Sequence, residues 1–303
     1  MPDTRKRPMS ASTHRLQLLA AAALFSTGGA AIKATTLSSW QVAGFRSGVA
    51  ALILALLLPS ARRGWTWRVL LVGVAYAATL VLFVTANKMT TAANTIFLQS
   101  TAPLYILILG PWLLKEPIRR TDLVFMSVVG TGLLLFFVGT EAPVATAPDP
   151  VRGNVLAALS GVCWAVTVMG LRWLGSRPEG GGSALATVVA GNVIALLVCL
   201  PFALPVQTGG VADWLVVGYL GVFQIGLAYV FMTAAIRHVG ALEASTILLV
   251  EPALNPIWAW LAHGERPSSW AVGGGALILS ATLAKTWWDG RGIQPVRAIR
   301  PDD

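Results

Sequence analysis

The chain has 303 residues, of which 55% are hydrophobic and only 12% are charged, whereas soluble domains contain about 45–50% apolar and about 25% charged residues. The apolar content excludes a disordered chain and the two cysteines exclude a disulfide scaffold. The formal net charge is +9, but basic residues this few and scattered form no nucleic-acid-binding patch, so the composition indicates an integral membrane protein.

Ten apolar segments follow one another along the chain. A membrane-spanning helix needs about 20 predominantly apolar residues, and the segments that meet this length are 16–33, 40–59, 68–87, 92–114, 121–139, 154–173, 184–204, 214–235, 242–262 and 270–288. None shows the two-residue alternation of a membrane β-barrel strand. The first segment ends at Lys33 without a good small-residue cleavage site, so we expect an uncleaved first helix.

The longest connection, 140–153, divides these segments into two sets of five. We expect a first half, a linker and a second half between two cytoplasmic tails, with boundaries at 1–15, 16–139, 140–153, 154–288 and 289–303. Because five is odd, two halves of one fold would lie in opposite orientations in the membrane, as in many secondary transporters. The expected fold is an all-α integral membrane protein with ten transmembrane helices in two inverted five-helix repeats.

Two offsets along the chain give limited support for a repeat. A shift of 149 residues superposes matching residues of the two halves, and a shift of 139 superposes similar ones. The first shift pairs Ala86 with Ala235, Pro103 with Pro252 and Glu116 with Glu265; the second pairs Phe25 with Trp164 and Lys33 with Arg172. In a chain rich in alanine and leucine, these identities alone do not establish the repeat.

The basic residues indicate the orientation. With a cytoplasmic N-terminus, 17 of the 22 basic residues fall on the cytoplasmic side, four fall on the other side, and Arg46 alone lies within a span. This distribution follows the positive-inside rule and predicts that both termini are cytoplasmic.

Arg46 and Glu251 are the two charged residues deep within predicted spans. Insertion scales give a cost of about 2.5–3.5 kcal/mol for an arginine or acidic residue at the bilayer centre. Arg46 is either a snorkelling or helix-bridging residue, or a gate residue or partner of a substrate carboxylate. Glu251, with Pro252 and Asn255 on the same helix, either bonds a neighbouring helix or contacts a substrate ammonium group or coupling proton.

Other polar and aromatic residues recur at helical spacing on several spans, and each is either a packed core residue or part of a central cavity. Tyr76, Thr79 and Phe83 share one face; so do Thr95 and Gln99, Ser160, Trp164 and Thr167, and Gln224 and Phe231. The candidate substrate-binding residues are Trp164, Gln99, Tyr76, Phe83, Thr95, Gln224, Glu251 and Asn255, and Arg46 is the candidate gate or ion-pair residue.

Catalysis has little support in the sequence. The three histidines fall at span ends or in tails, no Cys/His set has metal-ligand spacing, and no Walker loop or Rossmann fingerprint occurs. We expect no enzyme, cofactor or metal. The expected partners are a small-molecule substrate and the lipid bilayer, without nucleic acid. A small-residue stripe at Gly153, Ala157, Gly161 and Ala165 is either a contact within one protomer or a dimer face, so the oligomeric state stays open.

The chain resembles the ten-helix EamA-type exporters of the drug/metabolite transporter superfamily. The resemblance covers about 16–288 and rests on the order of short motifs: Phe45-Arg46, Ala92-Ala93, Pro103, Lys115-Glu116-Pro117, Trp164-Ala165, Leu249-Val250-Glu251-Pro252 and Gly264-Glu265-Arg266. It departs in having Ala102 where the second half has Glu251.

The resemblance implies an exporter of the bacterial inner membrane that works by alternating access around a central cavity. Its expected substrates are neutral or aromatic amino acids, related small metabolites or small toxic compounds. Among its members the aromatic amino-acid exporters are favoured, since the candidate cavity is aromatic and amide-rich and offers few basic residues to a phosphate. The alternative is a small multidrug or toxic-cation efflux carrier coupled to protons through Glu251.

Overall fold

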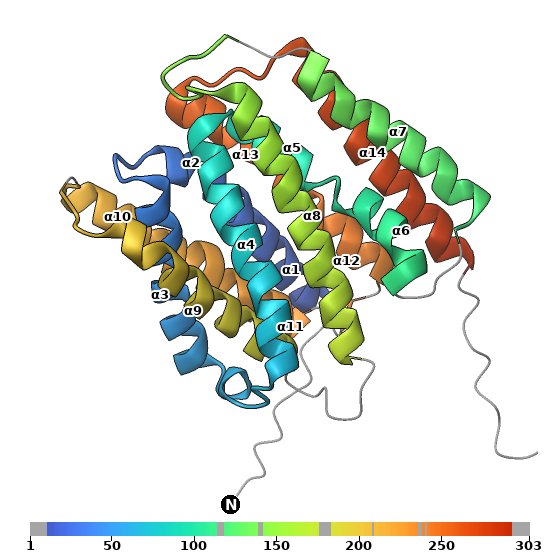
Figure 1. The fold of residues 1–303 in the computed structure, drawn as a ribbon. Helices are drawn as coiled ribbons and strands as arrows, with labels where there is room; N and C mark the ends of the chain where they lie inside the picture. Colours follow the sequence, from blue (N-terminus) through green and yellow to red (C-terminus); the bar gives the residue numbers. More distant parts are fainter. Residues whose placement is uncertain are drawn as a thin grey trace, which may run out of the picture.

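The computed structural model describes residues 11–113, 118–138, 142–175, 183–207, 209–235, 238–239 and 241–292. These residues are almost entirely helical, and their β structure is limited to an isolated antiparallel bridge between Val144 and Ala147. Figure 1 shows one bundle in which α7 and α14 lie together along one side.

Every predicted apolar segment is helical in the described residues. The elements of the first part of the chain are α1 (Ala11–Ser26), α2 (Gly28–Lys33), α3 (Ser39–Leu57), η1 (Pro59–Arg62), α4 (Trp67–Met89), α5 (Ala92–Gln99), α6 (Ala102–Leu113) and α7 (Arg120–Val138). Those of the second part are α8 (Pro150–Gly175), α9 (Ser183–Ala203), α10 (Val211–Tyr219), η2 (Leu220–Leu227), α11 (Ala228–Ala235), α12 (Ala241–Leu248), α13 (Val250–His263) and α14 (Ser269–Gly292).

Eight helices of the described part are long and apolar enough to cross a membrane, from Ser12–Lys33 to Val211–Ala235. The ninth predicted segment is divided at Leu249 into the shorter helices α12 and α13, and the tenth, α14, includes three consecutive glycines and Lys285. The chain is therefore a multi-span helical protein, while the count of ten spans remains a prediction.

Two helices are interrupted at corresponding places. The first break, at Ser100 and Thr101, separates α5 from α6, and the second, at Leu249, lies 149 residues after Ser100. A proline follows each break, Pro103 and Pro252. Because proline has no N–H, it cannot donate to the carbonyl four residues earlier, which favours an interruption.

Small residues let the helices approach closely. On α8, a Cβ atom added at Gly153 would lie 2.6 Å from the Cβ of Thr90, and one at Gly161 would lie 3.1 Å from the carbonyl oxygen of Leu98. Ala157 and Ala165 on the same stripe are fully buried. The predicted stripe thus packs within the protomer, against α4 and α5, and van der Waals contact holds the helices together.

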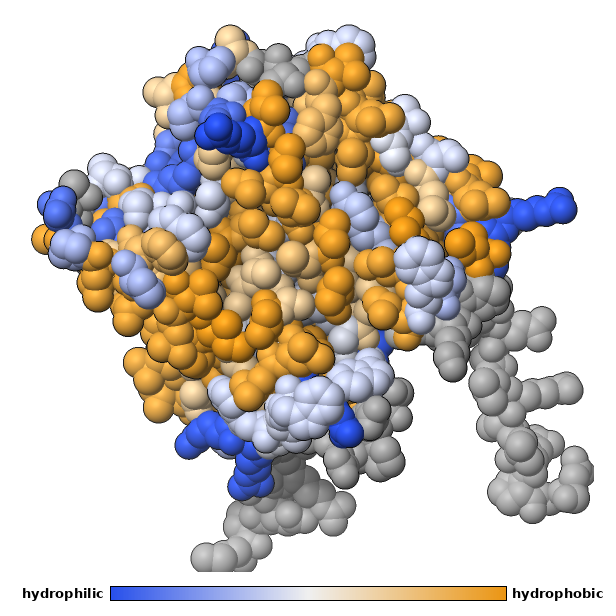
Figure 2. All heavy atoms as spheres, in the orientation of Figure 1, coloured by the Kyte–Doolittle hydropathy of each residue, from blue (hydrophilic) through white to orange (hydrophobic). Residues whose placement is uncertain are grey.

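The outer surface of the bundle is strongly apolar. Figure 2 shows hydrophobic side chains across most of the visible face, with hydrophilic ones gathered toward the ends. Exposed residues such as Leu52, Val124, Leu134 and Val198 contribute to this surface. A lipid environment suits such a surface, because a soluble protein would expose apolar patches of only a few hundred Å².

Candidate functional site

A cavity of about 300 Å³ lies in the centre of the bundle. Helices from both parts of the chain build its wall, which is lined by Phe25, Arg46, Tyr76, Thr79, Leu80, Phe83, Gln99, Trp164, Gln224, Ile225, Tyr229, Met232, Leu248 and Glu251. Gln99 and Leu248 are the last residues before the two helix breaks. The interrupted helices therefore bring both breaks to the same cavity.

The cavity brings together most of the residues singled out in the sequence. Seven of the nine candidates line it: Arg46, Tyr76, Phe83, Gln99, Trp164, Gln224 and Glu251. Thr95 and Asn255 are buried elsewhere. Thr95 donates its hydroxyl to the Thr91 carbonyl at 3.0 Å, and the amide of Asn255 lies against the backbone of Gly29.

The two charged cavity residues have no ion-pair partner among the described residues, either in each other or elsewhere. The Arg46 side chain is buried; its Nη2 atom donates to the Leu80 carbonyl at 3.4 Å, and its Nε atom has no hydrogen-bond partner. Glu251 borders the cavity from α13. One cavity thus presents an uncompensated guanidinium and an uncompensated carboxyl group.

Aromatic residues form much of the wall of the cavity. The Tyr76 hydroxyl donates to the Tyr229 hydroxyl at 2.9 Å, and the ring centroids of Tyr76 and Trp164 are 6.2 Å apart. Phe25 meets Tyr229 edge-on with centroids 5.4 Å apart. These rings offer flat apolar surfaces and two hydroxyl groups to a bound solute.

The amides of the cavity are held by hydrogen bonds. Gln99 donates from Nε2 to the Ser160 hydroxyl at 2.8 Å, and Ser160 donates to the Thr79 carbonyl at 3.2 Å. Gln224 donates to the Phe25 carbonyl at 3.4 Å, while its Oε1 atom is buried without a partner. Gln224 therefore retains an acceptor for another donor.

The sequence interpretation missed Tyr229 and paired Gln224 with Phe231 instead. An α-helical period of 3.6 residues puts positions seven apart on one face. The segment Leu220–Leu227 is a π-helix, however, in which the hydrogen bonds run from residue i to residue i+5. The wider turn brings Gln224 and Tyr229 to the cavity, and Phe231 does not line it. In the sequence of this segment, the signal for a cavity residue was a polar side chain, Gln224, within a long apolar span.

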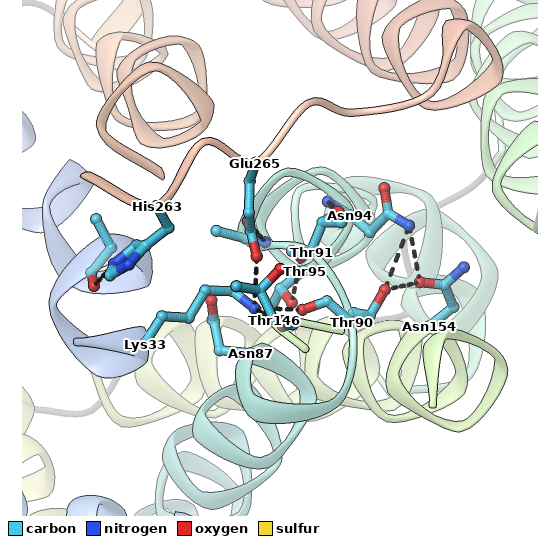
Figure 3. Close-up of polar contacts among 12 residues, drawn as sticks. Lys33, Asn87, Thr90, Thr91, Asn94, Thr95, Thr146, Asn154, His263 and Glu265 are labelled. Carbon is cyan, nitrogen blue, oxygen red and sulfur yellow. Dashed lines mark hydrogen bonds and ion pairs between the residues drawn. The ribbon is translucent and has the colours of Figure 1, made fainter. Parts of the chain in front are cut away.

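A polar cluster lies at one end of the bundle, and Figure 3 shows its contacts. Lys33 Nζ and Glu265 Oε1 are 2.8 Å apart, and each side chain is only 3% exposed. Lys33 also donates to the carbonyls of Thr90, at 2.8 Å, and Thr146. Glu265 Oε2 accepts from the Ala92 N–H at 2.9 Å. We call these five residues the Lys33–Glu265 cluster.

A second hydrogen-bonded group adjoins this cluster. The Asn154 Oδ1 atom accepts from Thr90 Oγ1 at 2.8 Å and from Asn94 Nδ2 at 3.1 Å, and its Nδ2 atom donates to the Phe136 carbonyl at 2.9 Å. The combined network ties α2, the turn between α4 and α5, the start of α8 and the segment after α13. It links these segments at one end of the bundle.

Comparison with known proteins follows the same division of the chain. A sequence profile described as the EamA-like transporter family matches residues 15–138 and again 151–285. The pseudopaline exporter CntI of Pseudomonas aeruginosa is 26% identical over 271 residues, which cover 86% of this chain and 91% of the relative. An uncharacterized transporter of Methanothermobacter thermautotrophicus is 24% identical over 226 residues, covering 70% of this chain and 61% of that protein. A solved crystal structure that matches this chain has a TM-score of 0.59 at 20% identity. The match covers 94% of this chain and 100% of that chain, and it shows likeness of fold.

Proposed function

Because the chain belongs to the EamA-like transporter family, we propose that it is a secondary transporter that exports neutral or aromatic amino acids and related small metabolites. One observation carries this assignment: Arg46 and Glu251 border the same cavity, and neither has an ion-pair partner among the described residues. A relative named as an exporter of pseudopaline supports export of a small metabolite.

A zwitterionic solute complements this pair of charges. A buried charge without a counter-ion is costly, and the cost falls when an opposite charge with good hydrogen-bond geometry binds to it. The Arg46 guanidinium suits a carboxylate, and the Glu251 carboxylate suits an ammonium group. A phosphate would favour more than one basic residue, and Arg46 is the one basic residue that lines the cavity in the described part of the chain.

The architecture we propose is ten membrane-spanning helices in two inverted halves, 16–139 and 154–288. The double match of the family profile and the helix breaks 149 residues apart support the two halves. The distribution of basic residues supports a cytoplasmic position for both termini, and the membrane we propose is a bacterial inner membrane. The Lys33–Glu265 cluster then lies on the outer side, and alternating access opens and closes that end in turn.

Counterflow in proteoliposomes tests this function. Labelled neutral and aromatic amino acids should accumulate above the level in empty vesicles, with and without a pH gradient. Arg46→Gln should lower that counterflow at least about tenfold, the loss expected for one charge-assisted hydrogen bond. Rates equal to empty vesicles across a broad amino-acid panel contradict the assignment.

A second candidate is a lipophilic-cation efflux carrier, which the position of Glu251 beside aromatic walls favours. In that case Glu251→Gln abolishes resistance to such cations in cells, while amino-acid counterflow is absent from the parent protein. Intact resistance in that variant rules this candidate out.

A further inference from the structure

A second, smaller space adjoins the central cavity. Its volume is about 100 Å³, and it shares the wall residues Tyr76, Trp164, Tyr229 and Met232 with the cavity. Its remaining wall comes from α8, α9 and α11, and is made by Thr167, Leu171, Ala184, Leu185, Thr187, Val188 and Thr233. We call this space the side chamber.

The side chamber lies on the side of the cavity away from the Lys33–Glu265 cluster. Three positions along α8 show the order: Asn154 adjoins the cluster, Trp164 lines the cavity and Leu171 lines the chamber. At 1.5 Å per residue, Trp164 and Leu171 lie about 15 Å and about 25 Å along the helix from Asn154.

The chamber offers almost no polar groups. Among the described residues, its lining contains no charged side chain, whereas the cavity holds both Arg46 and Glu251. Two of its threonine hydroxyls bond their own helices: Thr167 donates to the Cys163 carbonyl at 2.8 Å and Thr233 donates to the Tyr229 carbonyl at 2.7 Å. A threonine bonded in this way has its donor satisfied by the helix backbone. A solute in the chamber therefore meets mainly apolar surface.

From this segregation we infer that the side chamber is the subsite for the apolar side chain of the transported solute. The inference rests on the proposed function. The charged groups of an amino acid occupy the cavity, between Arg46 and Glu251, while its aliphatic or aromatic side chain lies past Trp164 in the chamber. Dry apolar cavities of about 150 Å³ bind molecules of the size of benzene. The chamber, at about 100 Å³ and with Met232 shared with the cavity, is of the size order of a leucine or phenylalanine side chain.

The matched variants Val188→Phe and Val198→Phe test this subsite. Val188 is buried and lines the chamber but not the cavity, whereas Val198, on the same helix, is 51% exposed on the outer surface. In the parent protein, leucine and phenylalanine should compete with the labelled amino acid in counterflow roughly tenfold more strongly than alanine does, since each buries several more carbon atoms. Val188→Phe should remove that advantage and leave alanine within about twofold, and Val198→Phe should change neither value.

Two further measurements keep the result unambiguous. Leu185→Ala, which enlarges the chamber, should shift preference toward tryptophan and so replaces Val188→Phe if that variant does not fold. Toluene, which has no charge, should raise the unfolding temperature of the purified parent and of Val198→Phe, but not of Val188→Phe. Transport with the same side-chain preference in all variants overturns the subsite. If amino-acid transport is absent but the toluene difference remains, the proposed function falls and the chamber remains only a site for apolar ligands. If the toluene difference is absent, the subsite itself is overturned.

Discussion

Trp164 borders both the cavity and the side chamber. Its ring faces Tyr76, and the hydroxyl of Tyr76 is bonded to Tyr229. These three side chains separate the charged part of the site from the apolar part. A change at Trp164 should therefore alter which solute fits before it alters whether the protein folds.

Trp164→Ala should change how well the amino acids with the largest side chains compete in counterflow by at least about tenfold, because the lost ring contact area belongs to the cavity wall. The yield of folded protein should stay close to that of the parent. Counterflow competition and size-exclusion chromatography measure the two quantities. Trp112→Ala is the matched control, since Trp112 is 80% exposed on the outer surface. A large loss of folded protein with unchanged preference would place Trp164 in the packing core instead.

At the scale of helices, the sequence predicts the location of nearly every element because apolar length alone marks a span. It predicts less where the helix period changes. Asn255 has the spacing of a cavity residue, one turn after Glu251, yet packs against Gly29. Tyr229 reaches the cavity only through the π-helical segment. The ion pair of Lys33 with Glu265 joins residues 232 positions apart, and no local pattern reveals such a contact.

Close packing of α8 on α4 leads to a prediction at the same scale. Gly153→Ala should lower the unfolding temperature by several degrees, because its Cβ would lie 2.7 Å from the Thr90 backbone nitrogen and the main chain must shift; such overpacking costs about 1–3 kcal/mol. Gly130→Ala on α7 is the control, since no neighbouring atom lies within 4 Å of its added Cβ. That change should leave stability equal or slightly higher, as alanine favours a helix. Thermal unfolding measures the stability of both variants, and equal effects of the two changes would contradict this packing.

The whole molecule has its central cavity between two unlike ends. The Lys33–Glu265 cluster links four segments of the chain at one end through a buried ion pair and hydrogen bonds. A second pair of residues far apart in the sequence, Arg15 with Glu243, is 56% and 42% exposed. An exposed pair contributes little, whereas removing one partner of a buried pair is costly. Under the proposed alternating access, the contacts of the Lys33–Glu265 cluster are ones that transport would break and remake at this end.

Neutralising one partner should open that end. The background protein has both cysteines replaced by alanine and carries Thr79→Cys as a reporter in the cavity wall. In this background, Glu265→Gln should raise labelling of the reporter by a membrane-impermeant maleimide at least about tenfold, when the maleimide is added on the side opposite the termini. The reason is that this change removes the partner of a buried charge. Lys33→Glu with Glu265→Lys should restore low labelling in part, since the swapped charges still attract. Glu243→Gln, at the exposed pair, should leave labelling unchanged. Labelling that stays low in a folded Glu265→Gln protein would mean that the close packing of Gly29, Ala92 and Asn255 seals this end without the ion pair.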